Sequence, residues 1–178
     1  MARGIVKGGN NDGAVIRLVQ SGETLMTSNA TEVTLTTPID ITKSIVIITV
    51  LPHTTSTSTT VKHLCVKPVL SGTNALTFYT NTYLLGSSPY VSWEVITFVN
   101  AKPKQTGEIA SVNGTTTATL ATAVSSKAIL VVSSTNSATT NSTTFYVYKF
   151  DAVITDSTTI TFRAFHTGHT IRYEVIDF

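Results

Sequence analysis

The chain has 178 residues, of which 42% are hydrophobic and 12% are charged. The hydrophobic content is enough for a packed core, which excludes a disordered chain, and the length fits one ordinary domain or two small ones. The net charge of +2 comes without a run of basic residues, so we expect no nucleic-acid partner.

Residues 1–7, MARGIVK, contain no uninterrupted apolar stretch behind their positive charge, so we expect no signal peptide and synthesis in the cytoplasm. No apolar stretch approaches the roughly 20 residues that span a bilayer, and no membrane partner is expected. The single cysteine, Cys65, excludes an intrachain disulfide, so stability must come from packing, within the chain or between subunits.

A strong turn signal follows at residues 8–13, GGNNDG. We find no counterpart for residues 8–27 in the second half of the chain. The pattern therefore predicts an amino-terminal arm or insertion that is confined to the first half.

Two apolar runs without alternation occupy residues 45–51 and 129–132. Strands that are covered on both faces have this pattern. We expect each run to lie at the centre of a sheet.

Internal similarity is the main signal for domain organisation. Four segments recur in the same order: 33–35 and 118–120, 42–48 and 126–132, 75–78 and 159–162, and 91–98 and 171–178. A proline at position 103 marks a linker over residues 99–104. We predict two copies of one domain, residues 1–100 with the arm or insertion and residues 101–178.

Frequent Thr and regularly spaced turn clusters predict the fold class. Thr is β-branched and suits strands, and several short strands separated by turns are typical of antiparallel sandwiches. The expectation is an all-β chain of two tandem antiparallel β-sandwich domains, either Ig-like or jelly-roll-like.

The last strand of the first copy is apolar on two sides. Trp93 and Val95 point one way, whereas Ile96 and Phe98 point the other, so this strand needs cover on both faces. The cover can come from the other domain, a neighbouring subunit or the second sheet. With the arm, this strand defines the predicted interface residues: Arg3, Gly4, Ile5, Val6, Lys7, Ile96 and Phe98.

Candidate catalytic and metal-binding residues are few. His166 and His169 form one pair, and His63 stands close to Cys65, but zinc needs three or four ligands and neither pair has a second pair to complete it. We expect no metal and no cofactor. The histidines are interpreted as turn residues and the cysteine as a small buried hydrophobe.

The recurring carboxylates are Glu94 and Glu174, at the same place in each copy, which favours a structural role duplicated with the domain. No Gly-x-Ser-x-Gly elbow and no phosphate-binding glycine loop occurs in the sequence. We therefore expect no catalytic residues and predict that the chain is not an enzyme.

A family resemblance rests on the opening at residues 3–6, the Thr-Lys-Ser step at residues 42–44 into an apolar strand, a Thr-rich strand and the last strand at residues 173–178. In these features the chain resembles small virion proteins of tailed bacteriophages. The resemblance implies a capsid decoration or cement protein, located in the virion, that binds the major capsid protein or other virion proteins as a homo-oligomer.

Two alternatives stay open. One is a receptor- or carbohydrate-binding module of a tail fibre, and the other is a tail-tube or adaptor component. A glycan site usually presents clustered aromatic side chains on loops, whereas Trp93 falls in a strand pattern. The decoration protein is therefore the leading hypothesis.

Overall fold

The computed structural model describes residues 14–51, 65–80, 89–136, 150–164, 167 and 169–178. Twelve strands in these residues form four antiparallel sheets of three strands each. The only helical element among them is the 3-10 turn η1 (Ile41–Lys43), and no helix in the described ranges has the length and hydropathy to cross a membrane. The predicted all-β fold class is confirmed.

The first sandwich consists of sheets A and B. Sheet A has the order β1 (Ile16–Leu25), β6 (Tyr90–Phe98), β3 (Ser44–Leu51), and sheet B has the order β2 (Ala30–Thr34), β5 (Ala75–Tyr79), β4 (Lys67–Gly72). Within this sandwich the first strand, β1, thus pairs with the last, β6, and the second, β2, pairs with the fifth, β5. This is the plan of an antiparallel ribbon rolled into two sheets, as in a jelly roll.

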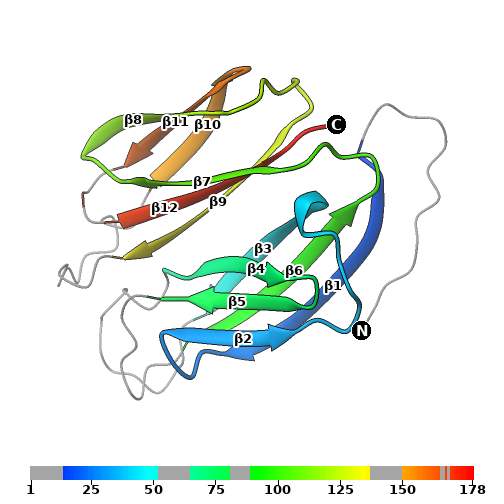
Figure 1. The fold of residues 1–178 in the computed structure, drawn as a ribbon. Helices are drawn as coiled ribbons and strands as arrows, with labels where there is room; N and C mark the ends of the chain where they lie inside the picture. Colours follow the sequence, from blue (N-terminus) through cyan, green and yellow to red (C-terminus); the bar gives the residue numbers. More distant parts are fainter. Residues whose placement is uncertain (1–13, 52–64, 81–88, 137–149, 165–166, 168) are drawn as a thin grey trace.

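The second sandwich repeats this plan strand for strand (Figure 1). Sheet C has the order β7 (Gln105–Ala110), β12 (His169–Ile176), β9 (Ile129–Asn136), and sheet D has the order β8 (Gly114–Thr119), β11 (Thr159–Ala164), β10 (Phe150–Asp156). The tandem character of the chain is therefore visible in its topology.

Each sandwich has its own core between its two sheets. Phe78 and Phe162 are fully buried at matching places, opposite Thr31 and Thr116. The rings of Trp93 and Tyr173 also occupy matching places, since Trp93 stands between Gly22 and Ile48 as Tyr173 stands between Gly107 and Val132. The segments matched in the sequence thus supply equivalent core positions.

A glycine in the first strand of each copy accommodates the aromatic ring. A Cβ atom added to Gly22 would lie 2.6 Å from Cζ2 of Trp93, and one added to Gly107 would collide with the ring and hydroxyl of Tyr173. Such close contacts do not occur in folded proteins, so glycine is required at both places.

The expected insertion at residues 8–27 is wrong for the part that the structure describes. β1 is the counterpart of β7, and the shared signal is Gln-x-Gly-Glu at residues 20–23 and 105–108. Gln20 holds the backbone of Thr37 through both amide atoms, at 2.8 and 3.0 Å. Gln105 holds Thr122 in the same way, at 2.7 and 2.8 Å. Residues 8–13 lie outside the described residues.

The expected central position of the two apolar runs is also wrong, because β3 and β9 lie at the edges of the sheets that the described strands form. Ile45 and Ile129 lie on the outer faces of their sheets, where the other domain covers them. This cover explains the apolar runs without a strand on each side of β3 and β9. Further along β3 this cover ends, and Ile47 and Leu51 are 45% and 47% exposed.

The glycine requirement can be tested with Gly22→Ala. The added methyl group has to displace the Trp93 ring, and overpacking of this kind costs about 1–3 kcal/mol of unfolding free energy. Gly72→Ala is the matched control, since its Cβ would meet only Cβ of Ala75, at 3.7 Å. Urea denaturation followed by circular dichroism measures both variants. Equal effects would contradict the packing described for Gly22.

Candidate interaction site

The two sandwiches are joined by a buried apolar contact. Sheet C is the layer of the second sandwich that faces the first, on the side where β3 and β4 run next to each other (Figure 1). The buried members of this cluster are Ile45, Phe98, Ala101 and Ile176, and Ile96, Ile129, Val131 and Phe178 pack around them. The rings of Phe98 and Phe178 meet edge to face with their centroids 5.0 Å apart.

Among the three kinds of cover considered for Ile96 and Phe98, the structure places these residues against the other domain of the same chain. The remaining predicted interface residues, residues 3–7, lie outside the described residues. Their contact with a second subunit or a capsid stays a prediction.

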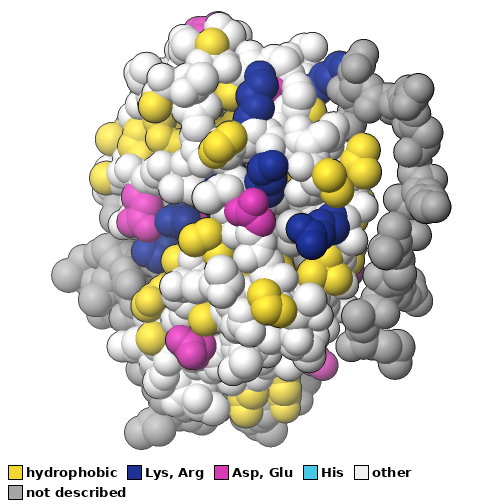
Figure 2. Space-filling model, turned by 45° about the vertical axis from the view of Figure 1, so that its right-hand side comes forward, with side chains coloured by type: hydrophobic (Ala, Val, Ile, Leu, Met, Phe, Trp, Pro, Cys, Tyr) yellow, Lys and Arg dark blue, Asp and Glu magenta, His cyan; other side chains and the backbone are white. Residues whose placement is uncertain are grey.

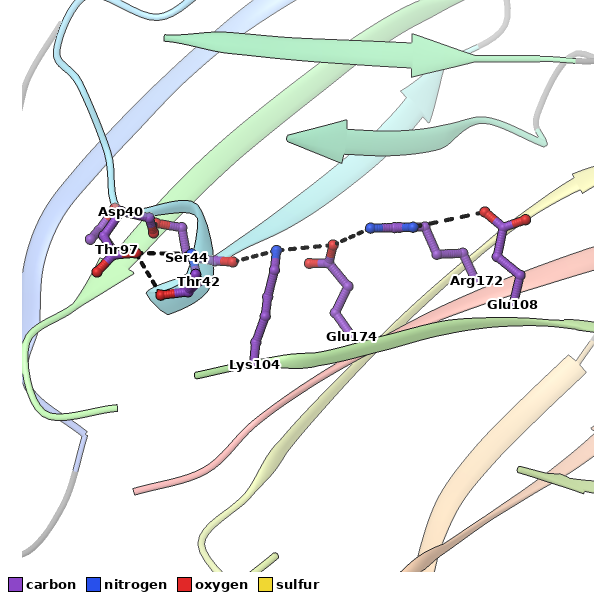
Figure 3. Close-up of polar contacts among 8 residues, drawn as sticks. All are labelled: Asp40, Thr42, Ser44, Thr97, Lys104, Glu108, Arg172 and Glu174. Carbon is purple, nitrogen blue, oxygen red and sulfur yellow. Dashed lines mark hydrogen bonds and ion pairs between the residues drawn. The ribbon is translucent and has the colours of Figure 1, made fainter. Parts of the chain in front are cut away.

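A chain of ion pairs runs along the same interdomain interface (Figure 3). The Lys104 ammonium lies 3.1 Å from Glu174, and Arg172 lies 3.1 Å from Glu174 and 3.8 Å from Glu108. Lys67 of the first domain completes the chain with a 2.9 Å contact to Glu108. The interface is therefore held by charge as well as by apolar packing.

Lys104 and Glu174 are the most buried members of this series of ion pairs, because their side chains are only 8% and 7% exposed. Burial lowers the pKa of Lys104, and the Glu174 carboxylate beside it opposes that shift. Oε1 of Glu174 receives both cations, whereas Oε2 has no hydrogen-bond partner among the described residues. A buried carboxylate of this kind depends strongly on its two cations.

Lys104 also ties the linker to the first domain. Its ammonium donates to the carbonyl of Ser44 at 2.7 Å, and its backbone N–H donates to the carbonyl of Thr42 at 2.7 Å. Ser44 is fixed in turn, because its hydroxyl donates to the carbonyl of Asp40 and bonds with the hydroxyl of Thr97, at 2.6 and 2.7 Å (Figure 3). The turn η1 and the first residue of β3 therefore present one ordered carbonyl each to Lys104.

A second carboxylate, Asp177, holds the end of the chain. Lys102 of the linker contacts it at 2.7 Å, and the backbone N–H of Ser125 donates to it at 3.1 Å. Burial raises the pKa of Asp177, but the bonds from Lys102 and Ser125 outweigh it and bring the pKa to about 2. The linker is thus anchored at both of its lysines.

Cys65 lies buried at the same interface, where its thiol hydrogen-bonds with Ser134 of the second domain. Burial raises the pKa of this thiol to about 11. The thiol is protonated at neutral pH and reacts slowly with thiol reagents while the two domains stay in contact.

Glu94 and Glu174 occupy the same place in the two copies but not the same environment. Glu174 is buried between cations, whereas Glu94 is exposed on the outer face of sheet A. The predicted common structural role therefore does not follow from their recurrence. The difference arises because the second domain covers only the end of this face in sheet A, at Ile45, Ile96 and Phe98, whereas Glu94 and Ile47 further along stay exposed.

Other charges on the molecule are sparse. On the face drawn in Figure 2, basic and acidic side chains lie in small mixed groups among hydrophobic and uncharged polar side chains. Of the histidines considered as metal ligands, His169 is buried and His63 and His166 lie outside the described residues. No group of three His, Cys, Asp or Glu side chains suited to a metal occurs within the described part of the chain.

The importance of the buried ion pairs can be tested with Glu174→Gln. Lys104 and Arg172 then lose their counter-charge in a desolvated place, so we expect a loss of at least about 2 kcal/mol in unfolding free energy by urea denaturation. Glu94→Gln is the matched control at the equivalent exposed position, with an expected change within about 0.5 kcal/mol.

The Cys65 thiol gives an independent measurement of the same interface. Glu174→Gln should also speed labelling of Cys65 by a thiol reagent under native conditions, because the two domains separate more often. Labelling as slow as in the unmodified chain, together with unchanged stability, would show that the ion pairs do not hold the interface.

The acid sensitivity of the chain end can be tested with Asp177→Asn. The folded pKa is about 2 and the ordinary value is 3.8, so the charged form stabilises the fold above pH 4, and this contribution disappears as the pH falls through 2. The difference in unfolding free energy between the two proteins should therefore be constant near neutral pH and shrink between pH 4 and 2. Parallel curves over that range contradict the assignment.

Comparisons of the chain with protein-family models, curated proteins and solved structures find no match. The chain itself contains an informative comparison, because its two copies share one fold and differ in what covers sheets A and C.

Proposed function

We propose that this chain is a non-enzymatic structural protein of a bacteriophage virion, a capsid decoration or cement protein that binds the head shell and assembles as a homo-oligomer. The supporting observation is that two jelly-roll-like sandwiches are held to each other by a buried apolar contact, with the ion pair between Lys67 and Glu108 and the bond from Lys104 to the carbonyl of Ser44 beside it. A protein that binds a repeating shell needs binding surfaces whose relative orientation is constant, and such a contact provides it.

The proposal also has a surface available for binding. The outer face of sheet A carries exposed apolar side chains, including Ile47 and Leu51, and this face is the one that its counterpart in the second copy uses for a protein contact. Exposed apolar side chains that are rimmed by polar residues often mark protein interaction sites.

The amino-terminal arm is the proposed anchor to the shell or to a neighbouring subunit, because an extended segment can add a strand to an open sheet edge. Deletion of residues 2–12 should leave the circular dichroism spectrum unchanged and greatly weaken rebinding of the purified protein to particles that lack it. Cys65→Ser keeps the arm and serves as the control, with rebinding at the level of the unmodified chain.

Undiminished rebinding of the truncated protein would rule out the arm as the anchor. Absence of any particle binding by the full chain, combined with binding to host cells, would replace the decoration role with the tail-fibre alternative. Electron microscopy of particles made without the gene locates the missing density and separates head from tail.

A further inference from the structure

The outer face of sheet A and the outer face of sheet C can be compared position by position. The strand registers make Glu94 equivalent to Glu174 and Glu23 equivalent to Glu108. In each sheet these two carboxylates lie on the same face of adjacent strands, two residues apart in the strand register. The residue beside the two carboxylates differs between the copies: it is Arg172 in sheet C and Ser92 in sheet A.

In sheet C, Arg172 satisfies the two carboxylates by placing its guanidinium between them, 3.1 Å from Glu174 and 3.8 Å from Glu108. In sheet A, the described residues form no ion pair with Glu94 or Glu23. The second cation of the buried pair is also missing there, since Val19 stands where Lys104 stands.

The place of the missing arginine is hollow. An open depression of about 400 Å³ lies on the outer face of sheet A, where Ser21, Ile47, Thr49, Ser92 and Glu94 line it. Its small side chains, Ser21, Thr49 and Ser92, leave room beside the Glu94 carboxylate. The apolar side chain of Ile47 forms part of its wall, and Leu51 follows two residues along the same strand.

We propose that this depression binds an arginine side chain of a partner protein, presented on an extended segment with apolar neighbours. The guanidinium takes the place between Glu94 and Glu23 that Arg172 takes between Glu174 and Glu108. Its planar fork of donors matches two carboxylates better than an ammonium does. The apolar neighbours of that arginine cover Ile47 and Leu51.

The partner is a different protein rather than a second copy. In a second copy, the strand equivalent to β4 is β10, and β10 carries a negative charge where β4 carries a positive one. Lys67 on β4 is the cation that meets Glu108 inside the chain, and its equivalent on β10 is Asp151. A second copy that docked in the same way would bring Asp151 towards Glu23, and like charges repel. The arginine site stands without the proposed virion role; only the identification of the partner as a shell protein rests on it.

The site is tested on the full chain by nuclear magnetic resonance with argininamide as the probe and citrullinamide as its uncharged counterpart. Argininamide should shift the backbone amide signals of Ser21, Ser92 and Glu94, and citrullinamide should not. Ser92→Arg supplies the missing guanidinium from within the chain and should abolish the response. Thr117→Arg, which adds an arginine at an exposed position of sheet D, is the matched control and should respond as the unmodified chain does.

Equal shifts with the two probes, or a response that persists in Ser92→Arg, would overturn the arginine site. The partner is tested by rebinding to particles, which Ser92→Arg should weaken at least about tenfold while Thr117→Arg does not. If argininamide binds as expected but Ser92→Arg rebinds particles as well as the unmodified chain does, the partner is not a shell protein. The arginine site itself is then retained. Self-association in sedimentation that Ser92→Arg removes would make the occupant a second copy and overturn the choice of partner.

Discussion

The buried Glu174 carboxylate needs two cations to compensate its charge, and the contact between the two sandwiches is built around this constraint. Lys104 comes from the end of the linker and Arg172 from the same strand as Glu174, and Lys104 also donates to the carbonyl of Ser44, which ties this group of charges to the first domain. Desolvated charges are costly without partners, which makes other arrangements of the two domains unfavourable. Apolar packing around Phe98 and Phe178 supplies attraction, and the ion pairs supply orientation.

The two copies share the residues that build the sandwich and differ at residues on the outer faces of sheets A and C. Gln20 and Gln105 clamp a neighbouring backbone in the same way, and Gly22 and Gly107 both make room for an aromatic ring. These positions maintain the sandwich itself. Positions that differ between the copies, such as Ser92 and Arg172, lie on the outer face of sheets A and C, in the part that is open in the first copy.

Local patterns were sufficient to predict an all-β chain, the sandwich class and the equivalence of Trp93 with Tyr173, because these depend on alternation and on repeated short segments. The edge position of β3 could not be predicted, since the cover on its second face comes from the other domain. The match between β1 and β7 was missed because the meaning of Gly22 depends on a ring far along the chain. The ion-pair chain joins residues of separate elements, and no spacing in the sequence reveals it.

The equivalence of β1 and β7 has a consequence for folding. Both strands carry the glutamine and the glycine that the sandwich requires, so β7 can compete with β1 for the edge of β6, and a newly made chain faces strand exchange between its own halves. In that exchanged state Lys104 would take the place of Val19 beside Ile96, in apolar surroundings, and Glu174 would lose one of its two cations. The charge at position 104 therefore penalises the exchanged topology and favours the correct one.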